Sequence, residues 1–238
     1  MSDSTGSIYY QDDFVTLYLG DCLTQTAWLD ADVLCTDPPY GRAWRQRKFR
    51  QATGGYKSEN AAGLTGISGD ADTTVRDAAL TMWGHERPWI VFGDLLLAPP
   101  VKTMLTSVYA KPADSGLRGA IGGVRRDAEA IYLGGAFTSG VGGRSSIFRS
   151  ARSNIGNPSG VVATSGGHPH AKPTDVLTEL LLLTTGTVAD PFAGSGSTLV
   201  AAKALGRRAI GVELDERYCE MAARRLAQGV LDFEGLGA

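Results

Sequence analysis

The sequence predicts an α/β fold with a mainly parallel, seven-stranded sheet and helices on both faces. Segments with strand character alternate with segments of helical spacing along most of the 238 residues, which is typical of a parallel sheet that is covered on both sides. Hydrophobic residues make up 43% and charged residues 20% of the chain, so it is globular rather than disordered. We expect one domain over residues 1–238, a length that can bury a large core.

The predicted elements follow in order along the chain. Strand character is found over 14–19, 32–36, 89–92, 105–110, 128–133, 187–189 and 208–212, and helical spacing over 71–83, 174–183, 197–205 and 215–228. Many of the 31 glycines fall in two further stretches, 41–69 and 134–167. Both stretches are predicted to be long loops or small inserts, which are usually functional or mobile in a compact domain.

Composition excludes several classes of protein. The formal charge of -2 excludes a globally basic nucleic-acid binder but allows a locally basic one. No apolar run reaches the roughly 18 residues of a membrane span, and Met1–Ser4 lacks the features of a signal peptide, so we expect a cytoplasmic protein without a membrane partner. Cys22, Cys35 and Cys219 are far apart, which suits reduced core thiols, and no metal site is expected.

A glycine-rich turn lies at 190–197, between a strand and a helix. In open α/β sheets this position is a ligand crevice, where glycines allow close approach to the backbone and the helix start offers free N–H groups. The next strand ends at Glu213, whose carboxylate can accept both hydroxyls of a ribose. Such a geometry serves any adenosine cofactor. The NAD fingerprint is disfavoured, because Leu199 stands where its third glycine is needed.

The segment Asp37-Pro38-Pro39-Tyr40 follows a predicted buried strand. Two consecutive prolines force an extended and rigid exit from that strand. A carboxylate, a free carbonyl and an aromatic ring are thereby presented at the carboxyl edge of the sheet. That set fits a planar amine, with two acceptors for the amino hydrogens and a ring that stacks on the base. The alternative is an ordinary turn that is capped by a packed tyrosine.

Together, the two segments resemble the catalytic and cofactor motifs of S-adenosylmethionine-dependent DNA amino-methyltransferases. The catalytic motif comes first, as in the β group of this family, whose motif order is circularly permuted. Further matches lie at Gly20-Asp21, at Phe92-Gly93-Asp94, at Glu129–Tyr132, which resembles a His-Glu strand, and at His168–Pro173, which resembles an HPxxKP segment. The resemblance implies a single Rossmann-like class I methyltransferase domain.

Site residues follow from the resemblance position by position. Asp37 and the Pro38 carbonyl would bind the target amino group and, with Pro39 and Tyr40, form the catalytic segment. The implied cofactor is S-adenosyl-L-methionine, with Glu213 at its ribose, Asp21 at its adenine, and Asp190 and Lys172 near its methionine end. The full set of expected cofactor contacts is Asp21, Cys22, Lys172, Asp190, Phe192, Ala193, Gly194, Ser195, Gly196, Glu213 and Leu214.

Local charge indicates where DNA would bind. Residues 40–58 contain six basic side chains and no acid, with aromatic residues interleaved, and residues 134–173 contain four basic side chains and no acid. We predict a mobile basic loop at 41–69 and a short target-recognition insert at 134–167. The expected DNA contacts are Arg42, Arg45, Arg47, Lys48, Arg50, Arg144, Arg149 and Arg152.

The function predicted from the sequence is site-specific methylation of adenine N6 in double-stranded DNA, by direct displacement on a flipped base. N4-cytosine methylation is the near alternative, because it uses the same machinery. A catalytically inactive DNA-binding module of the same fold is an alternative from another class, and a homodimer is a further expectation. The chain is expected to act in a bacterium, or as a phage protein in its host.

Overall fold

The structure is a computed structural model of the 238-residue chain. It describes residues 7–42, 48–52, 55–59, 70–112, 122–137, 142–150 and 171–228.

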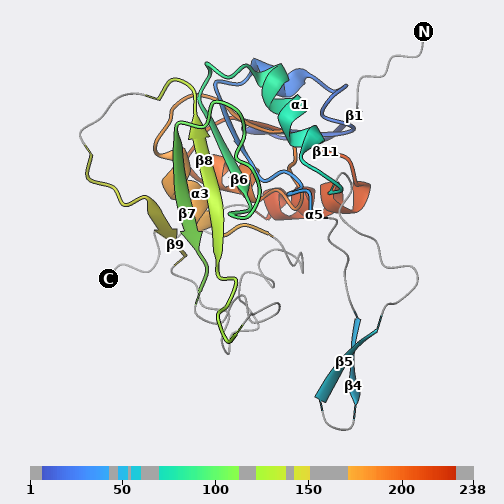
Figure 1. Cartoon of the computed structure of the whole chain (residues 1–238). Helices are drawn as coiled ribbons and strands as arrows, with labels where there is room; N and C mark the ends of the chain where they lie inside the picture. The colour runs from blue at the N-terminus through green and yellow to red at the C-terminus, as the bar shows by residue number, and fades with distance from the viewer. Residues whose placement is uncertain are drawn as a thin grey trace, which may run out of the picture.

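A nine-stranded sheet forms the centre of the molecule (Figure 1). In spatial order its strands are β1 (Ser7–Gln11), β2 (Val15–Leu19), β11 (Ala209–Glu213), β10 (Val188–Asp190), β3 (Val33–Thr36), β6 (Trp89–Gly93), β8 (Ala128–Gly134), β7 (Leu105–Ala110) and β9 (Ile147–Arg149). Every predicted strand is confirmed. Strand direction is mainly parallel, as expected, because only β1 and β8 run opposite to the others in this sheet.

The predicted number of seven strands is wrong, because β1 and β9 extend the sheet at its two edges. Both strands give little sequence signal. The side chains of β1 are exposed or only partly buried, so it lacks the apolar run of a central strand. β9 has three residues, of which Phe148 alone is buried, and it lies in a stretch rich in glycine and serine.

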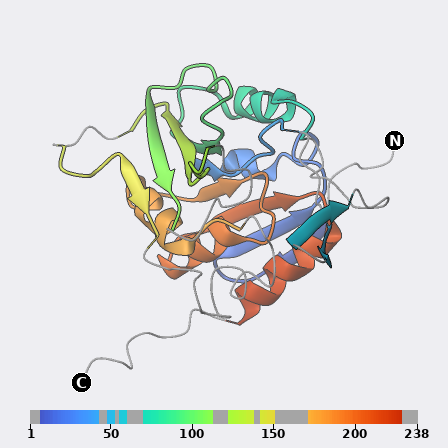
Figure 2. The same cartoon turned by 60° about the horizontal axis from the view of Figure 1, so that its bottom comes forward.

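Helices cover both faces of the sheet, as predicted (Figure 2). One face packs against α1 (Thr74–Trp83) and the short 3-10 helix η1 (Ala27–Asp30). The other packs against α3 (Thr174–Leu181), α4 (Ser197–Ala204) and α5 (Glu216–Ala227). The four predicted α-helices are therefore confirmed.

Strand β3 illustrates how the sequence builds this core. All four of its residues are buried, and successive side chains of a strand point to opposite faces. Val33 and Cys35 accordingly join the cluster with α3, α4 and α5, while Leu34 joins the cluster with α1. Burial of each such side chain stabilises the fold by roughly 1.5–3 kcal/mol. The strand that leads into Asp37 is thus fixed from both sides.

The predicted loop at 41–69 contains secondary structure that the sequence analysis did not foresee. Strands β4 (Lys48–Ala52) and β5 (Gly55–Glu59) pair as an antiparallel hairpin, separate from the main sheet (Figure 1). Both strands contain few apolar residues, unlike the five-residue strands β2 and β6, so they give little strand signal in the sequence. The base of the segment is held by Asp70, whose buried carboxylate accepts hydrogen bonds from the N–H groups of Gly41 and Arg42.

Candidate active site

The two predicted motif segments leave the sheet side by side. Strands β3 and β10 are adjacent and parallel, with Val33 opposite Val188 and Leu34 opposite Ala189. The segment 37–40 follows β3 and the turn 190–196 follows β10, so both lie at the carboxyl edge of the sheet. Pairing of these strands brings together segments that are far apart in the sequence, in the place where open α/β sheets bind ligands.

The glycine-rich turn is shaped by its backbone and by its packing. Gly196 caps α4 with a φ of +78°, and a Cβ at this position would lie 2.8 Å from the Cβ of Ala222 on α5. Gly194 also has a positive φ, of +51°, but a Cβ there would meet no atom nearer than the Phe192 oxygen at 4.0 Å. Gly196 is therefore needed for close packing, while the backbone at Gly194 is open to an approaching ligand.

Glu213 connects this turn to the next strand. One of its carboxylate oxygens accepts the N–H of Gly194 at 2.8 Å, and the other accepts the N–H of Asp215 at 2.8 Å. A carboxylate oxygen can accept two hydrogen bonds, so both oxygens keep capacity for a ribose hydroxyl. The N–H of Gly20 bonds to the Glu213 carbonyl at 2.9 Å, which brings the exposed Asp21 to the same edge.

Asp190 lies inside the protein rather than on the surface of the turn. Its side chain is 2% exposed, and its Oδ1 accepts hydrogen bonds from the Thr36 hydroxyl at 2.6 Å and from the Phe192 N–H at 3.2 Å. Burial raises the pKa of Asp190 to about 6, although these hydrogen bonds and one from Thr198 oppose that shift. The geometry makes Asp190 a link between the ends of β10 and β3.

The other expected cofactor contacts differ in exposure. Cys22, Ala193 and Ser195 are buried, Phe192 is half-buried, and Leu214 is 57% exposed. In the described chain, therefore, Leu214 and Asp21 present their side chains at this edge of the sheet, whereas Cys22, Ala193 and Ser195 can offer a ligand little beyond their backbone groups.

In the segment 37–40, Pro38 is buried and the other three residues are half-buried. The Asp37 Oδ2 atom lies 2.6 Å from the Lys172 Nζ atom. Its Oδ1 atom is buried and has no hydrogen-bond partner in the described part of the chain. The Tyr40 hydroxyl donates to the Glu129 Oε2 atom at 3.3 Å. Asp37 thus has one oxygen in an ion pair and one buried acceptor that needs a donor.

Glu129 and Lys111 complete a charge cluster that the sequence analysis did not identify as part of the site. Glu129 lies near the start of β8, 3.3 Å from the Lys172 Nζ atom and 2.5 Å from the Lys111 Nζ atom. The resemblance matched Glu129 to a His-Glu strand and Lys111, within Val108–Pro112, to a later sheet strand of the family, but it gave neither residue a role in the site. The cluster of Asp37, Glu129, Lys111 and Lys172 holds two charges of each sign.

Burial and neighbouring charge set the ionisation of this cluster. Burial raises the pKa of Asp37, and the Glu129 charge adds to the shift while Lys172 opposes it. For Glu129, burial acts in the same direction, but the two lysines outweigh it and lower the pKa to about 2. Burial disfavours the Lys172 ammonium, yet the two carboxylates raise its pKa above the ordinary value. For Tyr40, burial and then the two carboxylates raise the pKa.

The predicted DNA contacts are only partly covered by the described residues. Arg42 forms an ion pair with Asp94, and Arg144 and Arg149 are exposed. Lys48 and Arg50 lie on β4, but the structure describes only their backbone. Arg45, Arg47 and Arg152 lie outside the described residues.

Across the described ranges, His, Cys, Asp and Glu side chains form no group of three or more that could hold a metal ion. In that same part of the chain, every helix falls short of the length and apolar character of a membrane span.

The three cysteines are buried and unpaired, as predicted. Burial raises the pKa of Cys22 and of Cys219 to about 12, so neither is a thiolate at neutral pH.

Solved structures share this fold. PvuII DNA methyltransferase, named as cytosine-N4-specific, aligns with a TM-score of 0.60 at 13% identity, over 94% of this chain and 90% of its own. M1.HpyAVI in complex with SAM aligns with a TM-score of 0.56 at 16% identity, over 89% of this chain and 99% of its own. The chain thus shares the α/β fold of these two methyltransferases.

The family follows from the sequence itself. The N6_N4_Mtase family model, described as DNA methylase, matches residues 80–224, and the chain belongs to this DNA methylase family. It is 41% identical over 68 residues to the type II methyltransferase M2.LlaDCHI of Lactococcus lactis subsp. cremoris, which is 27% of this chain and 25% of that protein. It is also 42% identical over 62 residues to the DNA adenine methyltransferase YhdJ of Escherichia coli (strain K12), which is 25% of this chain and 21% of that protein. The chain thus matches a quarter or less of the length of these relatives.

Proposed function

We propose that the chain transfers a methyl group from S-adenosyl-L-methionine to the exocyclic N6 of adenine in double-stranded DNA. One observation carries the proposal. Pairing of β3 with β10 brings the amine-binding set of Asp37, Pro38 and Tyr40 beside a glycine turn that suits an adenosine cofactor. Membership of the DNA methylase family and the SAM complex of the structural neighbour M1.HpyAVI support it.

The cofactor would be held along the ends of β10, β11 and β2. Gly194 leaves the backbone open to it, and Glu213 has acceptor capacity for its ribose hydroxyls. Asp21 and Leu214 stand at the same edge for the adenine ring. When bound, the cofactor supplies an electrophilic methyl group on a positively charged sulfur.

The residues of the catalytic segment act on the target amine. Asp37 and the Pro38 carbonyl accept hydrogen bonds from its two hydrogens, which favours a pyramidal nitrogen and stabilises the positive charge that develops there. The bound cofactor would supply the methyl group by direct displacement at its sulfonium carbon, and Asp37 would accept the proton that the amine loses. Much of the remaining acceleration comes from positioning.

The target base must leave the DNA duplex to reach these groups. Tyr40 provides a ring on which a flipped base can stack, and such stacking contributes about 1–3 kcal/mol. The basic side chains of 41–69 and 142–150 are proposed to bind the DNA backbone. Arg149, the last residue of β9, and Arg144, which precedes this strand, are both exposed and suit this role.

Adenine is favoured over cytosine by two considerations. The resemblance associates Asp at the first catalytic position with adenine enzymes, and YhdJ is named as an adenine methyltransferase. N4-cytosine methylation is the alternative, since Asp37 and Pro38 serve either amine and PvuII methyltransferase is named as N4-specific. An inactive DNA-binding module would need none of the acceptor geometry around Asp37.

Incubation with tritiated cofactor and unmethylated genomic DNA, followed by mass spectrometry of the nucleosides, tests the proposal. We expect N6-methyladenine, and a loss of about 100–1000-fold in rate for Asp37→Ala. Cofactor binding by calorimetry should persist in that variant. N4-methylcytosine would overturn the base assignment, and cofactor binding without any methyl transfer would favour the inactive module.

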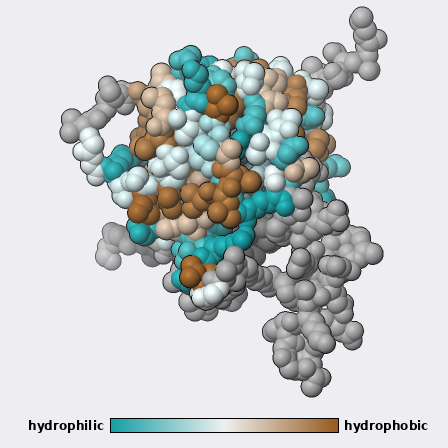
Figure 3. All heavy atoms as spheres, in the orientation of Figure 1, coloured by the Kyte–Doolittle hydropathy of each residue, from teal (hydrophilic) through white to brown (hydrophobic). Residues whose placement is uncertain are grey.

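We also propose that the chain forms a homodimer. Apolar side chains gather in a band on the face shown in Figure 3. Leu96, Val101 and Met104, between β6 and β7, are 74%, 69% and 76% exposed. Exposed apolar groups of this kind often mark association surfaces. Sedimentation of the wild type and of Met104→Ser would test whether this segment joins two copies.

A further inference from the structure

We propose that Lys172 is a positioning residue for methyl transfer, which holds Asp37 as an ionised acceptor for the target amine. This inference rests on the proposed function. The resemblance implied only that Lys172 lies near the methionine end of the cofactor. The structure instead shows its ammonium group between two carboxylates, one of which belongs to the catalytic segment.

The contacts of Lys172 are specific. Its side chain is 9% exposed, and the Nζ atom lies 2.6 Å from the Asp37 Oδ2 atom and 3.3 Å from the Glu129 Oε2 atom. The same nitrogen lies 5.3 Å from the centre of the Tyr40 ring and 5.2 Å from that of the Phe92 ring. A long side chain is thus held in one place by two charges and two aromatic faces.

Charges alternate through the cluster in the order Lys111, Glu129, Lys172 and Asp37. They come from four places in the fold: the residue after β7, strand β8, the residues before α3, and the segment after β3. Lys111 neutralises Glu129, which leaves the Lys172 charge to be shared with Asp37. Each member therefore depends on the next for compensation of a charge that is largely removed from water.

Without Lys172, the carboxylates of Asp37 and Glu129 would face each other with no cation between them. Like charges at close range drive one carboxyl to take up a proton. Asp37 is the one that would be protonated, because Lys111 still pairs with Glu129. A protonated Asp37 is neutral and carries an O–H donor, so it would be a weaker acceptor for the target amine and could no longer take up the proton that the amine loses.

Other titratable groups lie near the cluster, and the variants used in the test leave all of them unchanged. They are Tyr40 beside Asp37, Tyr109 on β7, Asp190 at the end of β10 and Asp175 at the start of α3. None of them is a cation. In the described part of the chain, Lys111 and Lys172 are the positive charges paired with the two carboxylates.

The ionisation of Asp37 can be followed in the whole chain without cofactor or DNA. Carboxyl carbon NMR of the 13C-labelled protein gives its midpoint, with Asp37→Asn to assign the signal. We expect Lys172→Met to move this midpoint to higher pH and Glu129→Gln to move it to lower pH. These opposite directions separate an electrostatic role from general damage to the fold, which would move both variants the same way.

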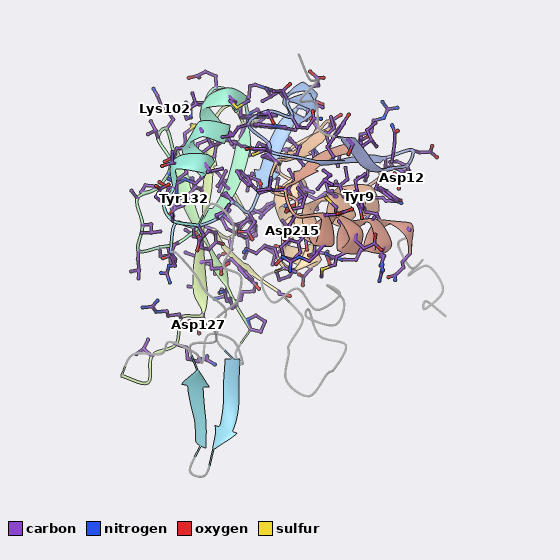
Figure 4. All side chains as sticks on the ribbon, turned by 90° about the vertical axis from the view of Figure 1, so that its right-hand side faces the viewer. Tyr9, Asp12, Lys102, Asp127, Tyr132 and Asp215 are labelled. Atoms are coloured by element: carbon purple, nitrogen blue, oxygen red, sulfur yellow. The ribbon has the colours of Figure 1, made fainter. Side chains whose placement is uncertain are left out.

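A matched control comes from another lysine–aspartate pair. Lys203 lies 2.5 Å from Asp12, and Figure 4 places Asp12 beside β1, on the side of the sheet opposite to Tyr132 of β8. Lys203→Met should leave the Asp37 midpoint unchanged. Lys172→Arg keeps the charge and should restore a midpoint close to that of the wild type.

The same variants should also differ in how their kcat depends on pH. The acid limb of kcat should move to higher pH in Lys172→Met and return in Lys172→Arg, whereas Lys203→Met should match the wild type. An Asp37 midpoint that is equal in wild type and Lys172→Met would overturn the inference, and a loss of cofactor affinity alone would assign Lys172 to the cofactor. Absence of methyl transfer by the wild type would contradict the proposed function, while the NMR titration would still test the role of Lys172.

Discussion

The guanidinium group of Arg225 on α5 donates a hydrogen bond to the Ser195 carbonyl across 2.6 Å. The same Nη1 atom lies 3.1 Å from the Ser195 hydroxyl and 3.1 Å from the Ser197 hydroxyl. The last described helix thus fixes the turn that is proposed to hold the cofactor. Nothing in the local sequence around Arg225 indicates this, because the residue follows the turn by nearly thirty positions.

Arg225→Ala is expected to weaken binding of S-adenosyl-L-methionine about 10- to 100-fold, because hydrogen bonds to a charged group contribute about 1.5–3 kcal/mol. Isothermal calorimetry measures the change. Arg224→Ala is the matched control, since Arg224 is the neighbouring arginine, is 74% exposed and pairs with Glu220 on the outer side of the helix. Equal affinities in the two variants would contradict a role for Arg225 in the turn.

Gly196→Ala should destabilise the fold by about 2–4 kcal/mol, through both its positive φ and the contact of the new Cβ with Ala222. Gly206→Ala provides the comparison, since Gly206 has a φ of +65° but no atom within 4 Å of an added Cβ. Urea unfolding of both variants separates the cost of backbone strain from that of packing. A Gly196 variant no less stable than the Gly206 variant would show that α5 yields at this contact.

Asp190 should make the protein less stable as the pH rises from about 4 to about 6. Burial raises its pKa from 3.8 to about 6, so the folded state binds more protons than the unfolded state between these values. The free energy of unfolding should therefore fall through this window, by at most about 3 kcal/mol from this group. Urea titrations at pH 4 and pH 7 should show the fall in the wild type and a smaller one in Asp190→Asn. Parallel pH dependence of the two proteins would refute the assignment.

Replacement of Arg45, Arg47 and Arg50 by Ala should weaken DNA binding and lower the slope of log affinity against log salt by roughly 0.9 for each lost phosphate contact. Fluorescence anisotropy at several salt concentrations gives the slope. The double variant Arg217→Ala/Arg224→Ala removes exposed charge from α5 and should leave the slope unchanged. An unchanged slope in the triple variant would move the DNA surface to another part of the chain.

The motif segments could be predicted from the sequence because short-range chemistry determines them. Consecutive prolines after the buried run 33–36 force an extended exit, and the glycines of 194–196 mark a tight turn between strand and helix. Strands β3 and β10, which lead into these two segments, are buried on both faces of the sheet. Each is therefore marked in the sequence by a short run of mostly apolar residues. The alternation of strands and helices predicted a mainly parallel sheet, but it did not predict that β3 pairs with β10.

The charge cluster could not be predicted in the same way. Lys172 meets Asp37 across 135 positions and Glu129 across more than forty, and these contacts depend on how β7 and β8 pair beside β6. A single charged residue near the start of a strand, such as Glu129, is more often on the surface. The two edge strands could not be predicted for another reason. The residues of β1 are exposed or only partly buried, and β9 has only three residues, so neither strand shows a clear alternation of apolar and polar side chains.

Strand β9 also determines which backbone N–H and C=O groups of β7 another chain could pair with. It pairs in parallel with β7 over Val108, Tyr109 and Ala110, and so covers the outer side of the second half of that six-residue strand. The hydroxyl of Ser150, directly after β9, donates a hydrogen bond to the Asp175 carboxylate of α3 at 2.9 Å. This bond attaches the end of β9 to a helix that packs on the sheet. An uncovered β7 would be a template for strand addition by a neighbouring molecule. Loss of this short strand should therefore lead to self-association and fibril growth under conditions in which the intact chain stays dispersed.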